Sequence, residues 1–164
     1  MAVDMFLKVA GIPGECQKKG HKDEIDIESF SFGANQTGSF HHGGAGGGAG
    51  KAEIQDVTVV KYADKASVNL FKACATGQHI PEVTIYAQKA GDNKQPMTYY
   101  TIKMQDVIVT NLTNQGSSAG DRITETVTFN TAKLTFDYQP QATTGAKDGG
   151  VITANYDVRQ NVAG

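Results

Sequence analysis

Apolar and polar residues alternate along most of this chain. In the opening segment the apolar positions are Val3, Met5, Leu7 and Val9. The same period of two recurs in segments rich in Val, Ile, Thr, Tyr and Phe, at residues 57–62, 81–87, 98–112, 122–138 and 151–160. Stretches with Gly, Pro, Asn or Asp separate them at 90–96, 114–121 and 143–150. Because a period of two places alternate side chains on opposite faces, the pattern predicts a mainly β protein.

In two segments the apolar positions change sides midway. In 24–33, "EIDIESFSFG", they move from Ile25 and Ile27 to Phe30 and Phe32. In 122–138 they move from odd-numbered to even-numbered positions. The odd-numbered residues are Ile123, Val127 and Phe129, and the even-numbered ones are Ala132, Leu134, Phe136 and Tyr138. A straight strand cannot do this, whereas a bulge, or a strand that passes from one sheet to another, can. We therefore predict a compact β-barrel of two packed sheets.

Helical propensity is concentrated in residues 63–77, "ADKASVNLFKACATG". Asp64 is a suitable residue to cap the start of this helix, and Gly77 to end it. A helical spacing joins Val68, Phe71, Cys74 and Ala75, which predicts that this stripe faces the core and that Cys74 packs there as a small apolar residue. We expect one α-helix on the flank of the barrel.

The composition narrows the function classes. The 164 residues suit a single domain, 1–164, and the net charge of −2 gives no basic footprint for nucleic acid or for an anionic membrane. No run approaches the about 20 apolar residues of a membrane helix. Cys16 and Cys74 have no metal-type spacing and fit a reducing compartment. With Asp4 and Lys8 in its first apolar stretch, the chain is expected to start in the cytoplasm without a cleaved signal peptide.

The Gly-rich segment 38–51, "GSFHHGGAGGGAGK", raises three possibilities: a phosphate loop, a metal site or a structural arm. A phosphate loop needs glycine where Ala45 stands and a hydroxyl where Ala52 stands. Adjacent residues on an extended chain point apart, so His41 and His42 are poorly placed to bind one metal. Ordering so many glycines costs entropy, which contacts with a neighbouring subunit can offset. We therefore favour an extended loop that docks on another subunit.

A polar row follows one side of the 122–138 segment, at Arg122, Thr124, Thr126, Thr128 and Asn130. One interpretation is an ordinary solvated face. The other is a surface facing a water-filled channel or a partner. Neither cysteine lies in a nucleophile motif and no carboxylate pair stands out, so we expect no enzymatic activity, no cofactor and no metal.

Six segments, in order, resemble the hemolysin-coregulated protein (Hcp) family of type VI secretion systems. They are "MAVDMFLKVAGIPGE", "DEIDIESFSFG", "GSFHHGGAGGGAGK", "VTVVKYADKASVNLFKACATG", "DRITETVTFNTAKLTFDYQPQ" and "YDVRQNV". The resemblance covers essentially the whole chain. It implies a small β-barrel with one flanking helix that assembles as a hexameric ring. Such rings stack into the inner tube, a structure similar to a phage tail tube.

The resemblance also implies partners and sites. The partners are other copies of the chain, a VgrG-type spike, contractile sheath proteins and secreted effectors, with no nucleic acid and no direct membrane insertion. The protein is itself secreted through this machine. By motif, Ser31 corresponds to a lumen-facing position that binds effectors, although many relatives have tryptophan where this chain has Phe30 and Phe32. The loop contacting a neighbouring ring or subunit corresponds to Ser39, Phe40, His41, His42, Gly43, Gly44, Gly46, Gly47, Gly48, Gly50 and Lys51.

Two other functions stay open at this stage. One is a monomeric β-barrel that binds a small ligand in its interior. This needs a cavity, and a barrel of this length with many core Val, Ile and Phe residues leaves little room. The other is a hydrolase or NTPase built on the Gly-rich loop, in which Lys51 would be essential.

Overall fold

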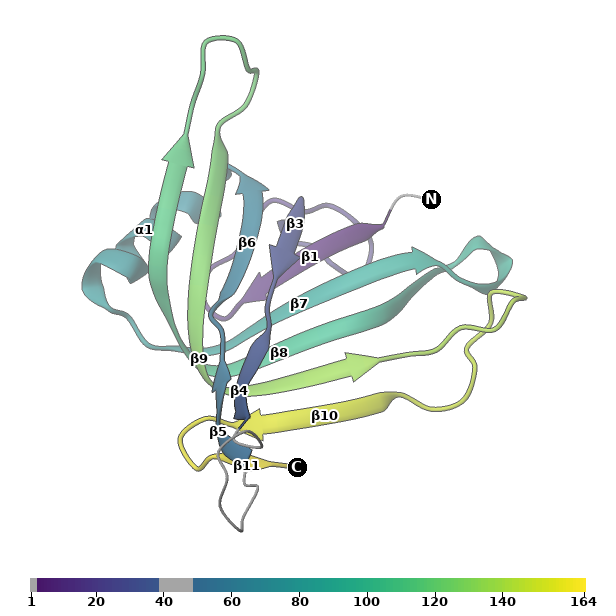
Figure 1. The fold of residues 1–164 in the computed structure, drawn as a ribbon. Coiled ribbons are helices and arrows are strands. Elements are labelled where there is room, and N and C mark those ends of the chain that lie inside the picture. Colours follow the sequence, from purple (N-terminus) through teal and green to yellow (C-terminus); the bar gives the residue numbers. More distant parts are fainter. Residues whose placement is uncertain (1–2, 39–48) are drawn as a thin grey trace.

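The computed structural model describes residues 3–38 and 49–164. Its strands are β1 (Asp4–Val9), β2 (Ile25–Asp26), β3 (Ser29–Ser31), β4 (Ala34–Gly38), β5 (Ala49–Ile54), β6 (Val57–Tyr62), β7 (Ile80–Ala90), β8 (Pro96–Gln115), β9 (Thr124–Tyr138), β10 (Ile152–Asp157) and β11 (Val162–Ala163). The helix α1 (Ala66–Thr76) precedes β7, and a short 3-10 turn, η1 (Asp92–Lys94), follows it. The prediction of a mainly β protein with one flanking helix is confirmed for the described residues (Figure 1).

Two layers share the long strands β8 and β9. One layer has the order β2-β1-β7-β8-β9-β10-β11, and the other has the order β3-β6-β9-β8. The first half of β9, residues 124–129, pairs with β6, and its second half, 133–138, pairs with β10. Both strands bend between the layers, as Figure 1 shows, and β8 has a register shift between Val109 and Asn111 at the bend. Within the described chain no pairing joins the outer strands to each other, so hydrogen bonds do not close the sheet.

Both predicted changes of phase correspond to changes of layer. Residues 25–26 pair with β1 in the first layer, and residues 29–31 pair with β6 in the second. The intervening Ile27 is buried, and Phe30 packs against the core from the second layer. The apolar residues change sides because the chain leaves one sheet for the other, and the core then lies on the opposite side of the strand.

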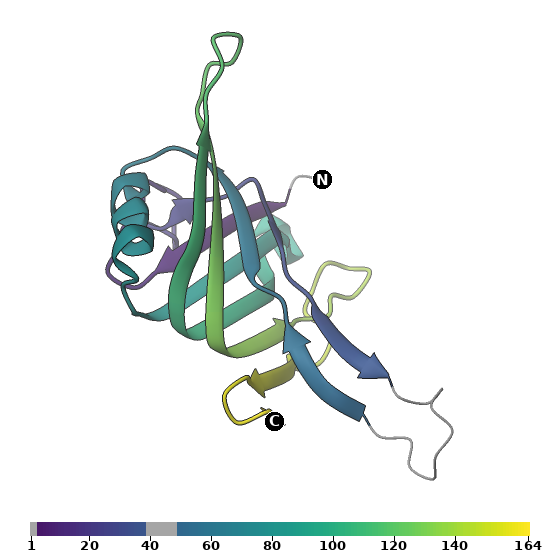
Figure 2. The same cartoon turned by 60° about the vertical axis from the view of Figure 1, so that its left-hand side comes forward.

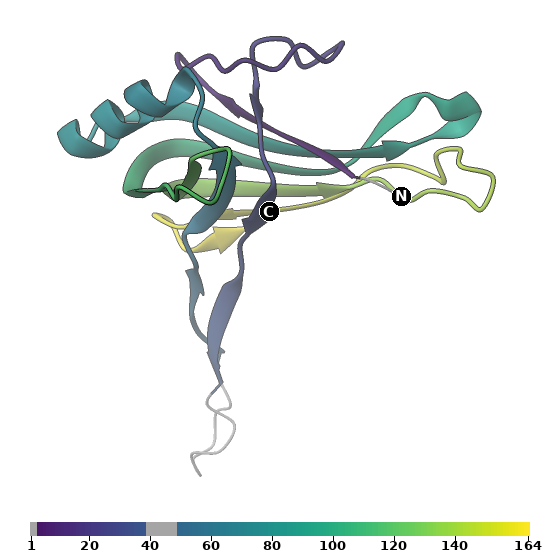
Figure 3. The ribbon, with the colours of Figure 1, turned by 90° about the horizontal axis from the view of Figure 1, so that it is seen from above.

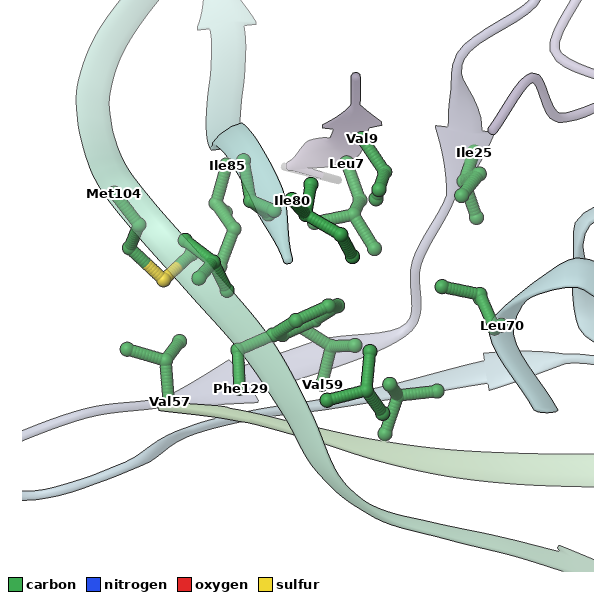
Figure 4. Close-up of a cluster of buried hydrophobic side chains, with 14 of the residues drawn as sticks. Leu7, Val9, Ile25, Val57, Val59, Leu70, Ile80, Ile85, Met104 and Phe129 are labelled. Carbon is green, nitrogen blue, oxygen red and sulfur yellow. The ribbon is translucent and has the colours of Figure 1, made fainter. Parts of the chain in front are cut away.

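The core lies between the two layers and under α1. Buried side chains from both layers meet there, among them Leu7, Ile85, Met104, Val59 and Phe129 (Figure 4). Leu70 reaches the same cluster from α1. Because these side chains fill the space between the layers, the interior is a packed core of the kind that stabilises a domain of this size.

The helix starts and ends where the sequence predicts, but it presents a different face. The Asp64 carboxylate accepts a hydrogen bond from the Ala66 amide at 3.0 Å, and Gly77 ends the helix in the left-handed conformation. The prediction that Val68 and Phe71 face the core is wrong, because they are 75% and 61% exposed. The buried positions are Ala66, Leu70 and Ala73, and Cys74 is half-buried against the core. The small side chains of Ala66 and Ala73 let the helix lie close to the sheet.

The strands β4 and β5 form a separate two-stranded ribbon. As far as the structure describes the chain, they pair with each other and with no strand of the larger sheet. The ribbon projects away from the body, and every residue of β4 is exposed (Figures 2 and 3). A two-stranded ribbon alone is at best marginally stable in water. The predicted loop residues from Ser39 to Gly48 lie outside the described residues, whereas Gly50 and Lys51 belong to β5.

Candidate functional site

The outer face of the β3-β6-β9-β8 layer carries rows of uncharged residues, polar except for Val60, which we call the polar face. Directly opposed residues on neighbouring strands share a face, so the pairing register defines the rows. One row is Ser31, Thr58, Thr128 and Asn111, and the next is Ser29, Val60, Thr126 and Thr113. The predicted polar row of β9 therefore belongs to a surface that extends across four strands.

Alternation along each strand separates this face from the core. Inward-facing neighbours are Phe30, Val59, Val127 and Leu112, which pack in or against the core. On the outer side Ser31 is exposed, and the Thr58 and Thr128 hydroxyls lie 3.2 Å apart in a hydrogen bond. The hydroxyl and amide groups of the rows can exchange hydrogen bonds with water or with a bound polypeptide, and none of them carries a charge.

Charged groups border the polar face at two ends. At the β5–β6 end, the Asp56 carboxylate accepts hydrogen bonds from Asn130 Nδ2 at 2.8 Å and Thr110 Oγ1 at 3.1 Å. At the other end, the Arg122 guanidinium lies 4.7 Å from the centre of the Tyr62 ring. The predicted lumen position Ser31 thus lies among neutral residues, with Asp56 and Arg122 at the edges of the surface.

The layer that carries the polar face has two free edges. At one side, among residues 3–38 and 49–164, β6 is the one strand that pairs with β3. At the other side β8 pairs with β7 only up to Val107, so that residues 108–115 have β9 as their one partner strand in the described part of the chain. Free edges present unpaired N–H and C=O groups that can bind another chain. These two edges lie on opposite sides of the same layer, which suits contact between copies arranged head to tail.

A buried ion-pair network, which the sequence pattern alone did not predict, lies directly behind this face. Lys61 Nζ is 2.9 Å from Glu125 Oε1 and 2.9 Å from Asp64 Oδ1, and it donates to Ser67 Oγ at 3.1 Å. The side chains of Lys61 and Glu125 are fully buried. The network joins β6, β9 and the start of α1. The sequence does contain a sign of this network. Lys61 alternates in step with Val57 and Val59, so it points to the same side of β6 as these two core residues.

The histidines that the structure describes make local contacts. His21 is buried and stacks on Phe6 at 4.0 Å, with Nδ1 2.6 Å from Glu24 and Nε2 2.6 Å from Gln88. These contacts attach the loop that follows β1 to the sheet. His79 lies 3.0 Å from Asp106 at the surface. Among residues 3–38 and 49–164, no three His, Cys, Asp or Glu side chains are grouped for a metal ion.

The two cysteines have different environments. Burial raises the pKa of the Cys16 thiol, and the carboxylates of Asp26 and Glu24 raise it further, although the Lys18 amide acts in the opposite direction. Cys74 is half-buried on α1. Because the thiolate is the reactive form, Cys16 should be the slower of the two toward a disulfide reagent.

We expect the folded protein to expose at most one rapidly reacting thiol to Ellman's reagent at pH 8. In the variant Cys74→Ser, the remaining thiol should react at least about tenfold more slowly than in urea-unfolded protein. The matched variant Cys16→Ser should keep the faster reaction of Cys74. Rapid labelling of folded Cys74→Ser protein would contradict this prediction.

Comparison with known proteins identifies the family. Residues 6–138 match the family model described as the type VI secretion system effector Hcp. This chain belongs to the Hcp family. It is 46% identical over 162 residues to protein hcp1 of Pseudomonas aeruginosa, and the match covers 99% of both chains. The resemblance found in the sequence is confirmed.

Solved structures agree with this family assignment. A structure described as a type six secretion system protein has a TM-score of 0.92 and 28% identity, covering 99% of this chain and 100% of that one. Hcp1 of Salmonella typhimurium has a TM-score of 0.81 and 35% identity, covering 99% of each chain. A type VI effector from Yersinia pestis has a TM-score of 0.76 and 37% identity, covering 94% of this chain and 100% of that one.

Proposed function

We propose that this Hcp chain, as a single domain over residues 1–164, is a structural subunit of the type VI inner tube. Copies would associate as hexameric rings, with the polar face lining a central channel, and the rings would stack. The observation that carries this proposal is the neutral polar face on a layer with a free edge at each side. An interface between two different edges closes into a ring when its rotation allows it.

The polar face would also hold passengers. Ser31 is exposed there beside Thr58 and Thr128, so a secreted effector inside the ring could contact these hydroxyl groups. A surface without charge discriminates little between passengers of different net charge, which suits a carrier of varied effectors. The Phe30 and Phe32 side chains pack from the inner side, and they set the shape of the face rather than its polarity.

We propose the remaining partners by similarity to the Hcp family. The projecting β4–β5 ribbon and the Gly-rich loop that it carries would contact a neighbouring ring or subunit, which would offset the low stability of an isolated ribbon. A VgrG-type spike would cap the tube and a contractile sheath would surround it. The chain would be made in the cytoplasm and exported by this machine. In the described residues, no helix has the length and hydrophobicity needed to cross a membrane.

The test is the particle mass of the purified protein. We expect light scattering at tens of micromolar to give a hexamer of the 17.4 kDa chain, and electron microscopy to show rings with an open centre. A strictly monomeric mass with no rings would reject the proposal and favour the monomeric ligand-binding alternative.

A further inference from the structure

The outward side of α1 is an apolar surface with a basic border. We call Lys65, Val68, Phe71, Lys72 and Ala75 the α1 outer face. All five residues are exposed, and Val68 and Phe71 keep 75% and 61% of their surface accessible. Isolated exposed apolar residues are ordinary, but an aromatic and a β-branched residue one turn apart on a short helix form a contiguous patch.

This patch is not required for the helix to attach to its own domain. Ala66, Leu70 and Ala73 make the inward contact, and the Lys61 network anchors the first turn through Asp64 and Ser67. The helix lies on the flank of the body, against β8 and away from the β4–β5 ribbon (Figures 1 and 2). Val68 and Phe71 are therefore free to contact another molecule.

The charges on this face have one sign. Lys65 and Lys72 are two turns apart and lie along one side of the apolar stripe, and the helix from Ala66 to Thr76 contains no carboxylate. Within the described chain neither lysine has an ion-pair partner, and the nearby Glu15 carboxylate accepts from the Lys65 backbone amide instead. A local excess of positive charge on a chain of net charge −2 selects for an acidic partner.

We propose that the α1 outer face docks an acidic amphipathic helix of another protein. Val68, Phe71 and Ala75 recur at i, i+3 and i+7, which is the spacing that packs against the apolar stripe of a second helix. Ala75 is small and lets the two axes approach at one end. Carboxylates along one side of the partner's stripe would pair with Lys65 and Lys72, as charges beside a helix–helix seam do.

The test uses a synthetic amphipathic helix of about 18 residues with a Leu stripe flanked by Glu, labelled with a fluorophore. A second peptide has Lys in place of each Glu. Fluorescence anisotropy should show that the full chain binds the Glu peptide at least about tenfold more tightly than the Lys peptide. The variant Phe71→Ser should lose at least about tenfold of that affinity, and K65E/K72E should reverse the preference between the peptides.

Matched controls use exposed residues away from this face. Ile152→Ser removes an apolar side chain that is 63% exposed on β10, and K94E/K147E reverses the charge of two other exposed lysines. Both variants should bind the Glu peptide like the parent chain. All the altered side chains are exposed, so circular dichroism should show an unchanged fold.

Several results would overturn the inference. They are equal binding of the two peptides, absence of binding by either, or unchanged affinity in Phe71→Ser. Loss of rings in Phe71→Ser would assign the face to contact between copies, and Phe71-dependent binding to phosphatidylglycerol vesicles would assign it to a membrane surface.

The inference goes beyond the proposed tube function. Failure of the parent chain to form rings would reject that function, whereas the peptide measurement tests the docking face alone.

Discussion

Lys61→Met is expected to lower the free energy of unfolding by about 3–5 kcal/mol. The replacement removes a fully buried ammonium that contacts Glu125, Asp64 and Ser67. It leaves the Glu125 carboxylate buried without its cation, and that uncompensated charge is the main cost. Urea denaturation followed by circular dichroism measures the loss. Parent and variant should be compared at one protein concentration, because assembly adds to apparent stability.

Two companion variants make this prediction specific. K61M/E125L replaces both charges with apolar side chains and should recover most of the lost stability, because no buried charge then lacks a partner. Lys103→Met breaks an exposed cross-strand pair with Glu82 at 3.5 Å and should change stability by no more than about 1 kcal/mol. If Lys61→Met proves no worse than Lys103→Met, the network is not the anchor between α1 and the polar layer.

Ser31→Trp is expected to reduce passenger binding at least about tenfold while rings still form. Ser31 is exposed on the polar face, where its cross-strand neighbour is Thr58. A large side chain there would cover the hydroxyl groups of Thr58 and Thr128 without disturbing the core. The measurement is co-purification of a co-expressed effector with tagged rings, together with light scattering on the same sample.

The control is Ser117→Trp, in the turn between β8 and β9 that stands out from the body (Figure 1). It adds the same side chain to an exposed serine away from the polar face, and passenger binding should be unchanged. If Ser31→Trp abolishes the rings themselves, Ser31 belongs to an interface between copies. If it leaves passenger binding intact, the polar face is not the passenger site.

Much of the fold could be predicted from the local pattern. The strand segments, the helix that starts two residues after Asp64 and ends at Gly77, and the two changes of side are all confirmed. Each depends on residues within a few positions of one another. The side-chain period of a strand and the capping of a helix are local properties, which makes them visible without any knowledge of the neighbours.

The helix stripe shows where local pattern fails. Val68 and Phe71 have the same helical regularity as Ala66, Leu70 and Ala73, and hydrophobicity alone favours the larger side chains for the core. The choice is made by contacts from Lys61 to Asp64 and Ser67, which fix the rotation of the helix against β6 and β9. The exposed stripe that results is the α1 outer face.

The candidate site depends on pairing between distant parts of the chain. The sequence predicts a polar row on β9 and, through family resemblance, an exposed Ser31. The hydrogen bond between Thr58 and Thr128 joins residues 70 positions apart, and the register across β3, β6, β9 and β8 brings Ser31 into the same row. Periodicity specifies which side of its own strand a residue faces. Which strand lies beside it, and in which register, is set by packing between segments that no local pattern connects.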